Sequence, residues 1–439
     1  MPRIMVDLSF AIPHHGHVRL LKRASEFGDV IVALTSDEEV LATKGFSPEL
    51  NFAQRREILE HFKSVSEVIK SPWLITENYL DINNIDFLVH GDDNNNLVPD
   101  NRLKIFSRTK GISSSLIRKA AVKSYVNKKN TKLMLTPGPA AVLPENLYGL
   151  GPLFGRGDED YQKIYSSVFD WLKVVTGKKN IVCAQGSATF AIELALNTYV
   201  SGKVLLVDTG YYSSRIELLI DSKKVEITKC DYDGLQSMTG QFDWVAFAYT
   251  ETSVAFKCDI DIVRSAAQSL GAKVFCDATG SIGLEANHQY ADLMAFSSCK
   301  GLFGLSGACF IAHDGNLSRM ETRGFYTNLK THEEKKVTGP YHALASLYHV
   351  KEIHSILIER LMKSKFSIVN TYGKYITNRD NQPLLCTYLE ANIILNDNNI
   401  VTYTPRSKNK GTVVCHLGEI HQDSCEISNR IGFKDLVND

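Results

Sequence analysis

The stretch Arg3-Ile-Met-Val-Asp-Leu-Ser-Phe-Ala-Ile-Pro-His-His-Gly-His-Val-Arg-Leu-Leu-Lys-Arg-Ala-Ser-Glu-Phe-Gly28 decides how the first part of the chain folds. Residues 3–10 are mostly apolar and predict a β-strand, and residues 18–27 predict an amphipathic helix that Gly28 ends. The same alternation continues, with strands expected at 29–34 and 86–90 and helices at 54–62 and 113–121. Because strands that alternate with helices form parallel sheets covered by helices, residues 1–120 are predicted to be an α/β domain.

A second α/β pattern begins at Leu133. Strands are expected at 181–184, 204–207, 244–248, 274–277, 293–296 and 308–312, and helices at 190–199, 214–220 and 261–270. Residues 121–132, between the two patterns, are basic and polar and predict a linker. After residue 340 the pattern changes to a helix at 341–363 followed by shorter polar strands. We therefore expect a large α/β domain over residues 133–340 and a small α+β domain over residues 341–439.

The composition is that of a globular protein that binds neither nucleic acids nor membranes. Of the 439 residues, 49 are Lys or Arg and 49 are Asp or Glu, so the formal net charge is zero, whereas such binding needs a basic excess. The nine cysteines are scattered without a C-x-x-C pair, which argues against a disulfide framework or a structural zinc site. Because we find neither a signal peptide nor an apolar run of about 18 residues, we expect a protein of the reducing cytoplasm.

Two loops of the first domain are suited to bind phosphate groups. Pro13-His-His-Gly-His17 leads into a helix, where Gly16 permits close backbone approach and the helix N-terminus attracts an anion. His14 and His17 could bond a nucleoside triphosphate, although short His clusters also form metal sites or lie on surfaces. Residues 108–115, Arg-Thr-Lys-Gly-Ile-Ser-Ser-Ser, offer a fixed charge and several hydroxyls, although they would also suit an ordinary serine N-cap. Both loops follow strands of one expected parallel sheet, at the edge where such sheets bind ligands.

Six motifs in this order resemble the cytidylyltransferases of the glycerol-3-phosphate and ethanolamine-phosphate type. They are His14–His17, Thr35–Glu38, Lys44–Gly45, Asn51–Glu60 around Arg55, His90–Asp93 and Arg108–Ser115. The resemblance covers residues 1–120. It implies a Rossmann-like nucleotidyltransferase domain that transfers CMP from CTP, with Mg²⁺, to a phosphate-like oxyanion and releases pyrophosphate.

The same resemblance implies which residues would act. Catalytic roles fall to His14, His17, Lys44 and Arg108. The implied nucleotide-binding residues are Ser9, Phe10, His14, His17, Lys44, Asp92, Arg108, Ile112, Ser113, Ser114 and Ser115. One motif departs from the family, because its Gly-Thr-Phe-Asp is here Leu8-Ser9-Phe10-Ala11. The missing carboxylate removes the usual metal or acceptor contact, and we assign no residue of this chain as a metal ligand.

The second α/β pattern contains a different set of chemical groups. Residues 185–189, Gln-Gly-Ser-Ala-Thr, lead from an expected strand into a helix and form a third anion cradle. Asp277 ends one expected strand, and Lys300 follows another in the turn Ser297-Ser-Cys-Lys-Gly301. This pair fits pyridoxal phosphate chemistry, in which the lysine forms a Schiff base and the carboxylate keeps the pyridine nitrogen protonated. Taken singly, Lys300 would be a surface lysine and Asp277 a cap.

The ordered set resembles the alanine–glyoxylate branch of the fold-type-I aminotransferases, and within it the 2-aminoethylphosphonate transaminases. The matching motifs are Leu135–Pro139, Gly186–Thr189, Gly210–Arg215, Thr250–Ser253, Asp277–Ser281 and Ser298–Gly307. By this resemblance Lys300 and Asp277 are catalytic, and the protein is a homodimer in which each site is completed by the partner. The implied cofactor-binding residues are Gly186, Ser187, Ala188, Thr189, Tyr212, Thr252, Asp277 and Lys300.

The tail departs from this second family. The arginine that binds the substrate carboxylate in the family aligns best with His416, and Arg430 is a rival candidate near the end of the chain. A histidine cannot offer the planar bidentate fork of an arginine. The aminotransferase half, about 305 residues long, also has a shortened small domain, so transaminase activity is less firmly implied than cofactor binding.

The two resemblances together predict a bifunctional enzyme of phosphonate biosynthesis. One half would interconvert phosphonoacetaldehyde and 2-aminoethylphosphonate with an amino-acid donor, and the other would activate 2-aminoethylphosphonate with CTP. The alternative is a cytidylyltransferase for phosphoethanolamine or a polyol phosphate. In that case the pyridoxal phosphate domain would act on another amine or serve only in dimerisation.

Overall fold

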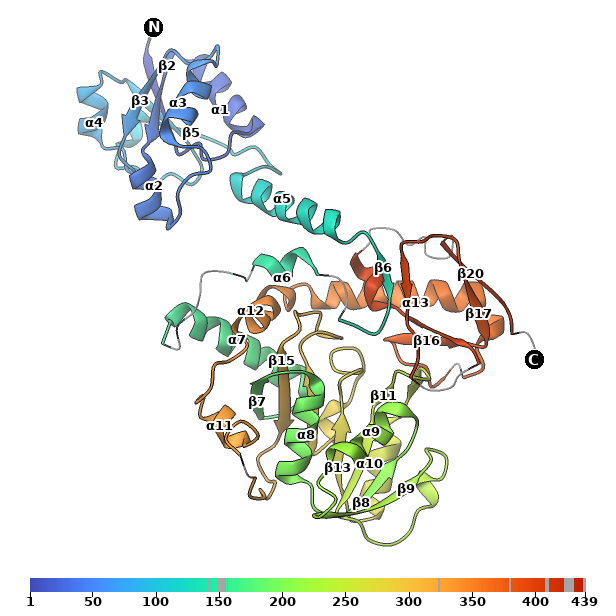
Figure 1. Ribbon diagram of the computed structural model, residues 1–439. Helices are drawn as coiled ribbons and strands as arrows, with labels where there is room; N and C mark the ends of the chain where they lie inside the picture. Colours follow the sequence, from blue (N-terminus) through green and yellow to red (C-terminus); the bar gives the residue numbers. More distant parts are fainter. Residues whose placement is uncertain are drawn as a thin grey trace. The chain divides into compact units, whose positions relative to one another are not determined.

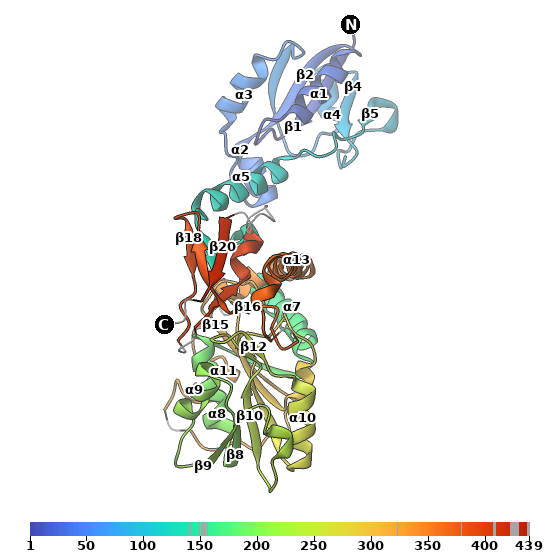
Figure 2. The same cartoon turned by 90° about the vertical axis from the view of Figure 1, so that its right-hand side faces the viewer.

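The computed structural model describes residues 1–139, 142–148, 150, 155, 157–322, 324–378, 380–406, 410–421 and 430–436. The chain divides into two compact units, residues 1–124 and 125–439 (Figures 1 and 2). Helix α5 (Ser114–Lys129) starts in the first unit and ends in the second. It runs through most of the segment predicted as a linker, 121–132, because that segment contains good helix formers and neither Gly nor Pro.

The first unit is a parallel five-stranded sheet with helices on its faces. The strands β1 (Arg3–Leu8), β2 (Asp29–Thr35), β3 (Glu67–Ser71), β4 (Phe87–Gly91) and β5 (Leu103–Phe106) lie in the order β3-β2-β1-β4-β5. The helices are α1 (His15–Ser25), α2 (Asp37–Lys44), α3 (Phe52–Glu60) and α4 (Glu77–Ile82). The chain leaves β1 toward β2 on one side and later adds β4 on the other side, and open sheets of this kind bind ligands at the carboxyl end of the strand where the order reverses, here β1.

Buried side chains on both faces of β1 explain why residues 4–6 of this strand are all apolar. Ile4 and Val6 pack into one core cluster, and Met5 packs into another on the opposite face. The sequence prediction missed β3 and β5, which are short edge strands that carry charged residues. The prediction that Gly28 ends the first helix was also wrong, because α1 ends at Ser25. A Cβ at Gly28 would instead collide with the carbonyl oxygen of Pro2.

The second unit is built on a seven-stranded sheet in the order β7-β15-β14-β13-β10-β8-β9. The strands are β7 (Asn180–Gln185), β8 (Gly202–Val207), β9 (Val225–Cys230), β10 (Trp244–Ala248), β13 (Lys273–Asp277), β14 (Leu293–Ser297) and β15 (Ala308–His313). All neighbours pair in parallel except β15, which is antiparallel to both β14 and β7. The covering helices include α7 (Glu159–Thr176), α8 (Ala188–Tyr199), α9 (Tyr211–Leu219) and α10 (Ile260–Ser269). The predicted α/β fold class is therefore confirmed for both halves of the chain.

Short ribbons and two helices complete the second unit (Figure 2). The ribbons pair β16 (Cys386–Leu389) with β19 (Thr412–Cys415), β17 (Ala391–Leu395) with β20 (Ile431–Asp435), and β18 (Ile400–Thr402) with β6 (Leu133–Leu135). Residues 133–135, expected to open the large domain, thus pair with the C-terminal part. The single helix expected at 341–363 is two helices, α12 (Tyr341–Val350) and α13 (His354–Tyr372). The break at 351–353 contains neither Gly nor Pro, so no residue signalled it.

Candidate active sites

In the first unit, His14 and His17 lie together at the start of α1. His14 is the N-cap residue, and its backbone N–H donates to His17 Nδ1 at 3.3 Å. The two imidazole rings stack with their centroids 3.7 Å apart. A Cβ at Gly16 would come within 2.9 Å of His14 Nδ1 and 3.2 Å of Ile112 Cγ2, so this close packing requires glycine. The same contacts bring Ile112, from the second phosphate loop, to the first.

Both imidazoles are neutral at pH 7. Burial lowers the pKa of His17 from 6.5 to about 3, and neighbouring His14 and Lys44 add to the effect. The pKa of His14 is also lowered, first by burial and then by His15. A neutral imidazole carries one N–H donor and one acceptor. Each neutral ring can therefore donate one hydrogen bond to a phosphate oxygen.

We expect the buried His17 to make stability depend on pH. In the unfolded chain its pKa is about 6.5, and in the folded chain it is about 3. Between these values the unfolded state binds more protons, so the free energy of unfolding falls as pH drops from 6.5 toward 3. Thermal melts of the full chain at pH 7 and pH 4.5 should show this loss, and His17→Asn should reduce it. An NMR titration that places the pKa of His17 near 6.5 would contradict the prediction.

Positive side chains gather beside the two histidines. Lys44 Nζ donates to Ser9 Oγ at 3.1 Å. The pKa of Lys44 is lowered, first by burial and then by the charges of Arg118, Arg108 and Arg55, although Asp93 acts in the opposite direction. Several cations that disfavour one another's charge are stabilised by an anion placed among them. This cluster is the candidate triphosphate site of the first unit, and its three arginines also pair with Asp37, Asp93 and Glu49.

Arg55 fixes the loop that carries Ser9 and Phe10. Its guanidinium is fully buried, donates to the carbonyl oxygens of Ser9 and Thr35, and pairs with Asp37 at 2.6 Å. Phe10 is held at φ 47°, a left-handed conformation that a non-glycine residue adopts only when its surroundings impose it. Arg55 lies inside the Asn51–Glu60 motif, but no sequence pattern indicates that its side chain is buried beneath the loop of Ser9 and Phe10.

The second phosphate loop lies beside the end of β4. Arg108 pairs with Asp93 and lies 3.6 Å from Asp92 Oδ1. Ser113 Oγ accepts from the Leu116 N–H in the first turn of α5, and Ser114 Oγ donates to the Ile12 carbonyl at 3.5 Å. Ser115 is exposed in the same turn. Ser114 and Ile112 thus bring this loop to the His14–His17 loop, while Ser113 is engaged as a helix cap.

Asp7 is an acidic residue of this site that sequence reasoning missed. It belongs to β1, its Oδ2 accepts from Asn96 Nδ2 at 2.8 Å, and it lies 3.5 Å from His90 Nε2. Its Oδ1 is buried without a partner among the described residues. Burial raises the pKa of Asp7, and His90 partly opposes this. The sequence signal that could have identified Asp7 is a carboxylate that follows the apolar residues 4–6 within one strand.

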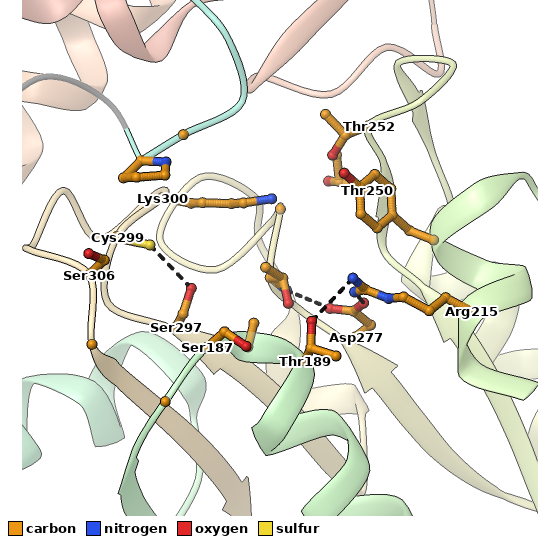
Figure 3. A pocket seen from close by; sticks show the side chains of 18 of the residues that line it. Ser187, Thr189, Arg215, Thr250, Thr252, Asp277, Ser297, Cys299, Lys300 and Ser306 are labelled. Carbon is orange, nitrogen blue, oxygen red and sulfur yellow. Dashed lines mark hydrogen bonds and ion pairs between the residues drawn. The ribbon is translucent and has the colours of Figure 1, made fainter. Parts of the chain in front are cut away.

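In the second unit, a cavity of about 380 Å³ brings the predicted cofactor residues together. Its lining includes Gly186, Ser187, Ala188, Thr189, Tyr212, Thr252, Asp277 and Lys300. Figure 3 shows Lys300 reaching into the cavity, with Arg215, Asp277 and Thr189 next to one another on its wall. Thr252 follows the short strand β11 (Thr250–Glu251), and the others lie at or after the carboxyl ends of β7, β13 and β14 or at the start of the helices α8 and α9. Parallel strands end at one edge of the sheet, which explains why residues far apart in the chain meet here.

The lining of this cavity contains several different chemical groups. Ser187 is the N-cap of α8, so the N–H groups of the first turn and the hydroxyls of Ser187 and Thr189 form an anion cradle. Asp277 accepts from the Thr279 N–H at 3.0 Å. Lys300 Nζ lies 5.7 Å from the centre of the Tyr212 ring. A phosphate cradle, an aromatic face, a carboxylate and an amine in one cavity of this size fit pyridoxal phosphate.

The turn that carries Lys300 is held rigidly. A Cβ at Gly301 would collide with the Ile282 carbonyl oxygen, so only glycine permits this approach. The Gly301 carbonyl also bonds His354 Nε2 at 2.8 Å. A carbonyl oxygen only accepts, so Nε2 carries a proton and donates, and burial lowers the pKa of His354. The amine of Lys300 therefore extends from a fixed backbone.

Sequence reasoning assigned no role to two arginines of this cavity. Arg215 donates to Thr189 Oγ1 at 3.2 Å and lies 3.7 Å from Asp277 Oδ2. Its guanidinium also lies over the Tyr212 ring, 4.9 Å from the ring centre. Arg406, between β18 and β19, is the second lining arginine. Arg215 is the last residue of the Gly210–Arg215 motif, whereas none of the sequence motifs includes Arg406.

The structure does not bring His416 or Arg430 to this cavity, contrary to expectation. His416 is fully buried, and its Nε2 is 2.8 Å from Thr387 Oγ1. It follows β19 at a position that points into the core. Arg430 pairs with Asp397 at 2.5 Å. Neither residue lines the cavity, so the substrate-carboxylate role expected for one of them is left to another residue.

Comparisons with known proteins fit these two sites. Residues 6–120 match the family model described as Cytidylyltransferase-like. The chain is 35% identical over 130 residues to the ethanolamine-phosphate cytidylyltransferase of Arabidopsis thaliana, which covers 26% of this chain and 30% of that protein. It is 26% identical over 245 residues to the 2-aminoethylphosphonate–pyruvate transaminase of Pseudomonas aeruginosa, which covers 49% of this chain and 66% of that protein. The chain thus spans only part of each relative.

A solved structure supports the fold of the second unit. The ureidoglycine–glyoxylate aminotransferase of Bacillus subtilis superposes with a TM-score of 0.55 at 15% identity, over 66% of this chain and 89% of that one. In the described residues, no helix is long and apolar enough to span a membrane. Residues 6–120 thus match a cytidylyltransferase-like family model, and the second unit has the fold of the solved aminotransferases.

Proposed function

We propose that this protein is a bifunctional enzyme that makes 2-aminoethylphosphonate and activates it with CTP. The second unit would interconvert phosphonoacetaldehyde and 2-aminoethylphosphonate with an amino-acid donor. The first unit would form CMP-2-aminoethylphosphonate and release pyrophosphate. The observation that carries this proposal is that one chain contains a cluster of His14, His17, Lys44 and Arg108 in its first unit and a cavity lined by Asp277 and Lys300 in its second. The similarity of the second unit to 2-aminoethylphosphonate–pyruvate transaminases supports the choice of substrate.

In the first unit, a phosphonate oxygen would attack the α-phosphorus of CTP. A new P–O bond forms, the bond to the β-phosphate oxygen breaks, and pyrophosphate leaves. His14 and His17, both neutral, would donate hydrogen bonds to phosphate oxygens on which negative charge develops, and Lys44 and Arg108 would balance that charge. Mg²⁺ would enter with CTP, because it prefers phosphate oxygens as ligands.

Asp7 gives this site a means to recognise the amino group of the substrate. A carboxylate with an unpartnered buried oxygen is costly, and a substrate ammonium would satisfy it and favour its charged form. Asp7→Asn should therefore raise the KM for 2-aminoethylphosphonate by about 10- to 150-fold, the range of a charged hydrogen bond. The KM for ethylphosphonate, which lacks the amine, should stay unchanged. Asp100→Asn, an exposed change in the same unit, is the control, and equal effects on both substrates would contradict this role.

In the second unit, pyridoxal phosphate, when bound, would supply the carbonyl that accepts an amino group and the ring that stabilises the adjacent carbanion. The Ser187–Thr189 cradle would bind its phosphate, and Tyr212 would orient the ring. Asp277 would hold a proton on the ring nitrogen. Lys300 would anchor the group and then, as an amine, move protons at the reacting carbon. We further propose that the protein acts as a homodimer, by similarity to this class of enzyme.

A second candidate function keeps the same chemistry but changes the substrate of the first unit. Its similarity to ethanolamine-phosphate cytidylyltransferases favours phosphoethanolamine, which differs from 2-aminoethylphosphonate by one bridging oxygen. In that case the second unit would act on another amine. Neither alternative changes the roles of His14, His17 or Lys300.

One assay distinguishes the two candidates. Pyrophosphate release from CTP is measured with 2-aminoethylphosphonate, phosphoethanolamine or glycerol 3-phosphate as the acceptor. We expect the highest kcat/KM with 2-aminoethylphosphonate, and the same compound should convert the bound cofactor to its amine form, seen as a change in absorbance. A preference for phosphoethanolamine together with no response of the cofactor to 2-aminoethylphosphonate would overturn the proposal.

A further inference from the structure

We propose that Arg406 binds the anionic group of the amine substrate in the cavity of the second unit. This inference rests on the proposed aminotransferase function and names the residue that would select its substrates. Both the carboxylate of an amino-acid donor and the phosphonate of 2-aminoethylphosphonate would bind to this one guanidinium in turn.

Arg406 lines the cavity from the short-ribbon part of the second unit. It follows β18, whereas most of the lining comes from the seven-stranded sheet and its helices. Its Nη1 donates to the Tyr211 hydroxyl at 2.9 Å, and its guanidinium lies 5.2 Å from the centre of the Tyr211 ring. Tyr211 is the neighbour of Tyr212, the aromatic face of the cofactor site. These two contacts hold the guanidinium beside the site.

The guanidinium of Arg406 has N–H donors to spare. The Arg406 side chain is exposed, and in the described part of the chain no carboxylate pairs with it. Arginine carries five N–H donors in a planar fork, and the Tyr211 hydroxyl accepts from Nη1 alone. The remaining donors can bind two oxygens of a carboxylate or phosphonate side by side, which a lysine or histidine cannot do.

The other cations of the cavity are committed. Arg215 is engaged by Thr189, Asp277 and the Tyr212 ring, and the proposed function uses the Lys300 amine for proton transfer. His416 and Arg430 contact Thr387 and Asp397 instead. Among the described residues that line the cavity, Arg406 is thus the cation with neither a carboxylate partner nor a chemical task.

The test compares Arg406→Gln and Arg406→Lys with a matched control. Arg430→Gln also removes one arginine from the tail, but at a position away from the cavity. Cofactor-loaded full-length protein is mixed with 2-aminoethylphosphonate or alanine, and the absorbance change is followed in single turnovers. Arg406→Gln should raise the apparent Kd for both compounds by about 10- to 150-fold. Arg406→Lys should restore part of the loss, and the control should match the wild type.

Two further measurements separate substrate binding from a structural effect. Ethylamine, which has no anionic group, should react equally with wild type and Arg406→Gln. Tyr211→Phe removes the hydroxyl that orients the guanidinium and should give a smaller rise in Kd, with the rate at saturation unchanged. Equal binding of 2-aminoethylphosphonate by wild type and Arg406→Gln, or an equal loss for ethylamine, would overturn the proposal.

Binding of unreactive anions keeps this test independent of the proposed function. Methylphosphonate and propionate are titrated calorimetrically into cofactor-loaded protein. If no amine changes the absorbance of the wild type, the aminotransferase function fails. The proposed role of Arg406 in anion binding would still be supported if Arg406→Gln abolishes the binding of these anions. It would be overturned if the substitution leaves their binding unchanged.

Discussion

Lys300→Ala should abolish amino transfer and leave CMP transfer at the wild-type rate. The substitution removes the amine that extends into the cavity from the fixed turn before Gly301. A positioned proton-transfer group contributes about 10²- to 10⁴-fold to the rate, and loss of the covalent anchor adds to this. Borohydride reduction of wild-type protein should trap the cofactor on the peptide that contains Lys300, and the mutant should trap none.

The control for this prediction is another lysine of the same unit. Lys203, exposed at the start of β8, should tolerate change to Ala with both activities intact. A trapped cofactor that mapped to a different lysine would show that the cavity around Lys300 has another purpose. Loss of CMP transfer in Lys300→Ala would show that the two sites are not independent.

His17→Ala should lower kcat for CMP transfer by about 10²- to 10³-fold, or about 2.7 to 4 kcal/mol of transition-state stabilisation, the scale for one preorganised donor. The ring is already neutral and held against His14, so it needs no reorganisation to donate. Cofactor binding in the second unit should be unaffected. The rate is measured as pyrophosphate release at saturating CTP.

Folding must be checked for this variant, because the His17 ring also packs against Phe10. His17→Asn keeps a side-chain donor and should recover part of the activity at similar thermal stability. His61→Ala, an exposed histidine of the same unit, should behave as wild type. Full activity in a folded His17→Ala protein would reduce the His14–His17 loop to a structural feature.

The sequence determined the α/β fold of each unit and most of the local chemistry. Strand and helix periodicity is a local property, so β1, β2, β4 and the central strands of the larger sheet could be predicted. The two candidate phosphate loops and the turn at Lys300 are short strand-to-helix or strand-to-turn segments. The chemical groups of each segment are neighbours in the sequence, so the sequence alone shows them together. Edge strands such as β3 escaped prediction because half-solvated backbone tolerates charged residues.

Which distant side chains meet depends on tertiary packing. His416 aligned with a substrate-binding arginine, but burial at the end of β19 directs it to Thr387. Arg406 lies in the cavity lining, where its side chain contacts Tyr211 across 195 residues of sequence. Such contacts leave no periodic pattern, since they depend on how packed elements place one chain segment against another. Local patterns therefore predicted the folds and the candidate cofactor residues, whereas the packing of the segment after β18 places Arg406 in the cavity lining.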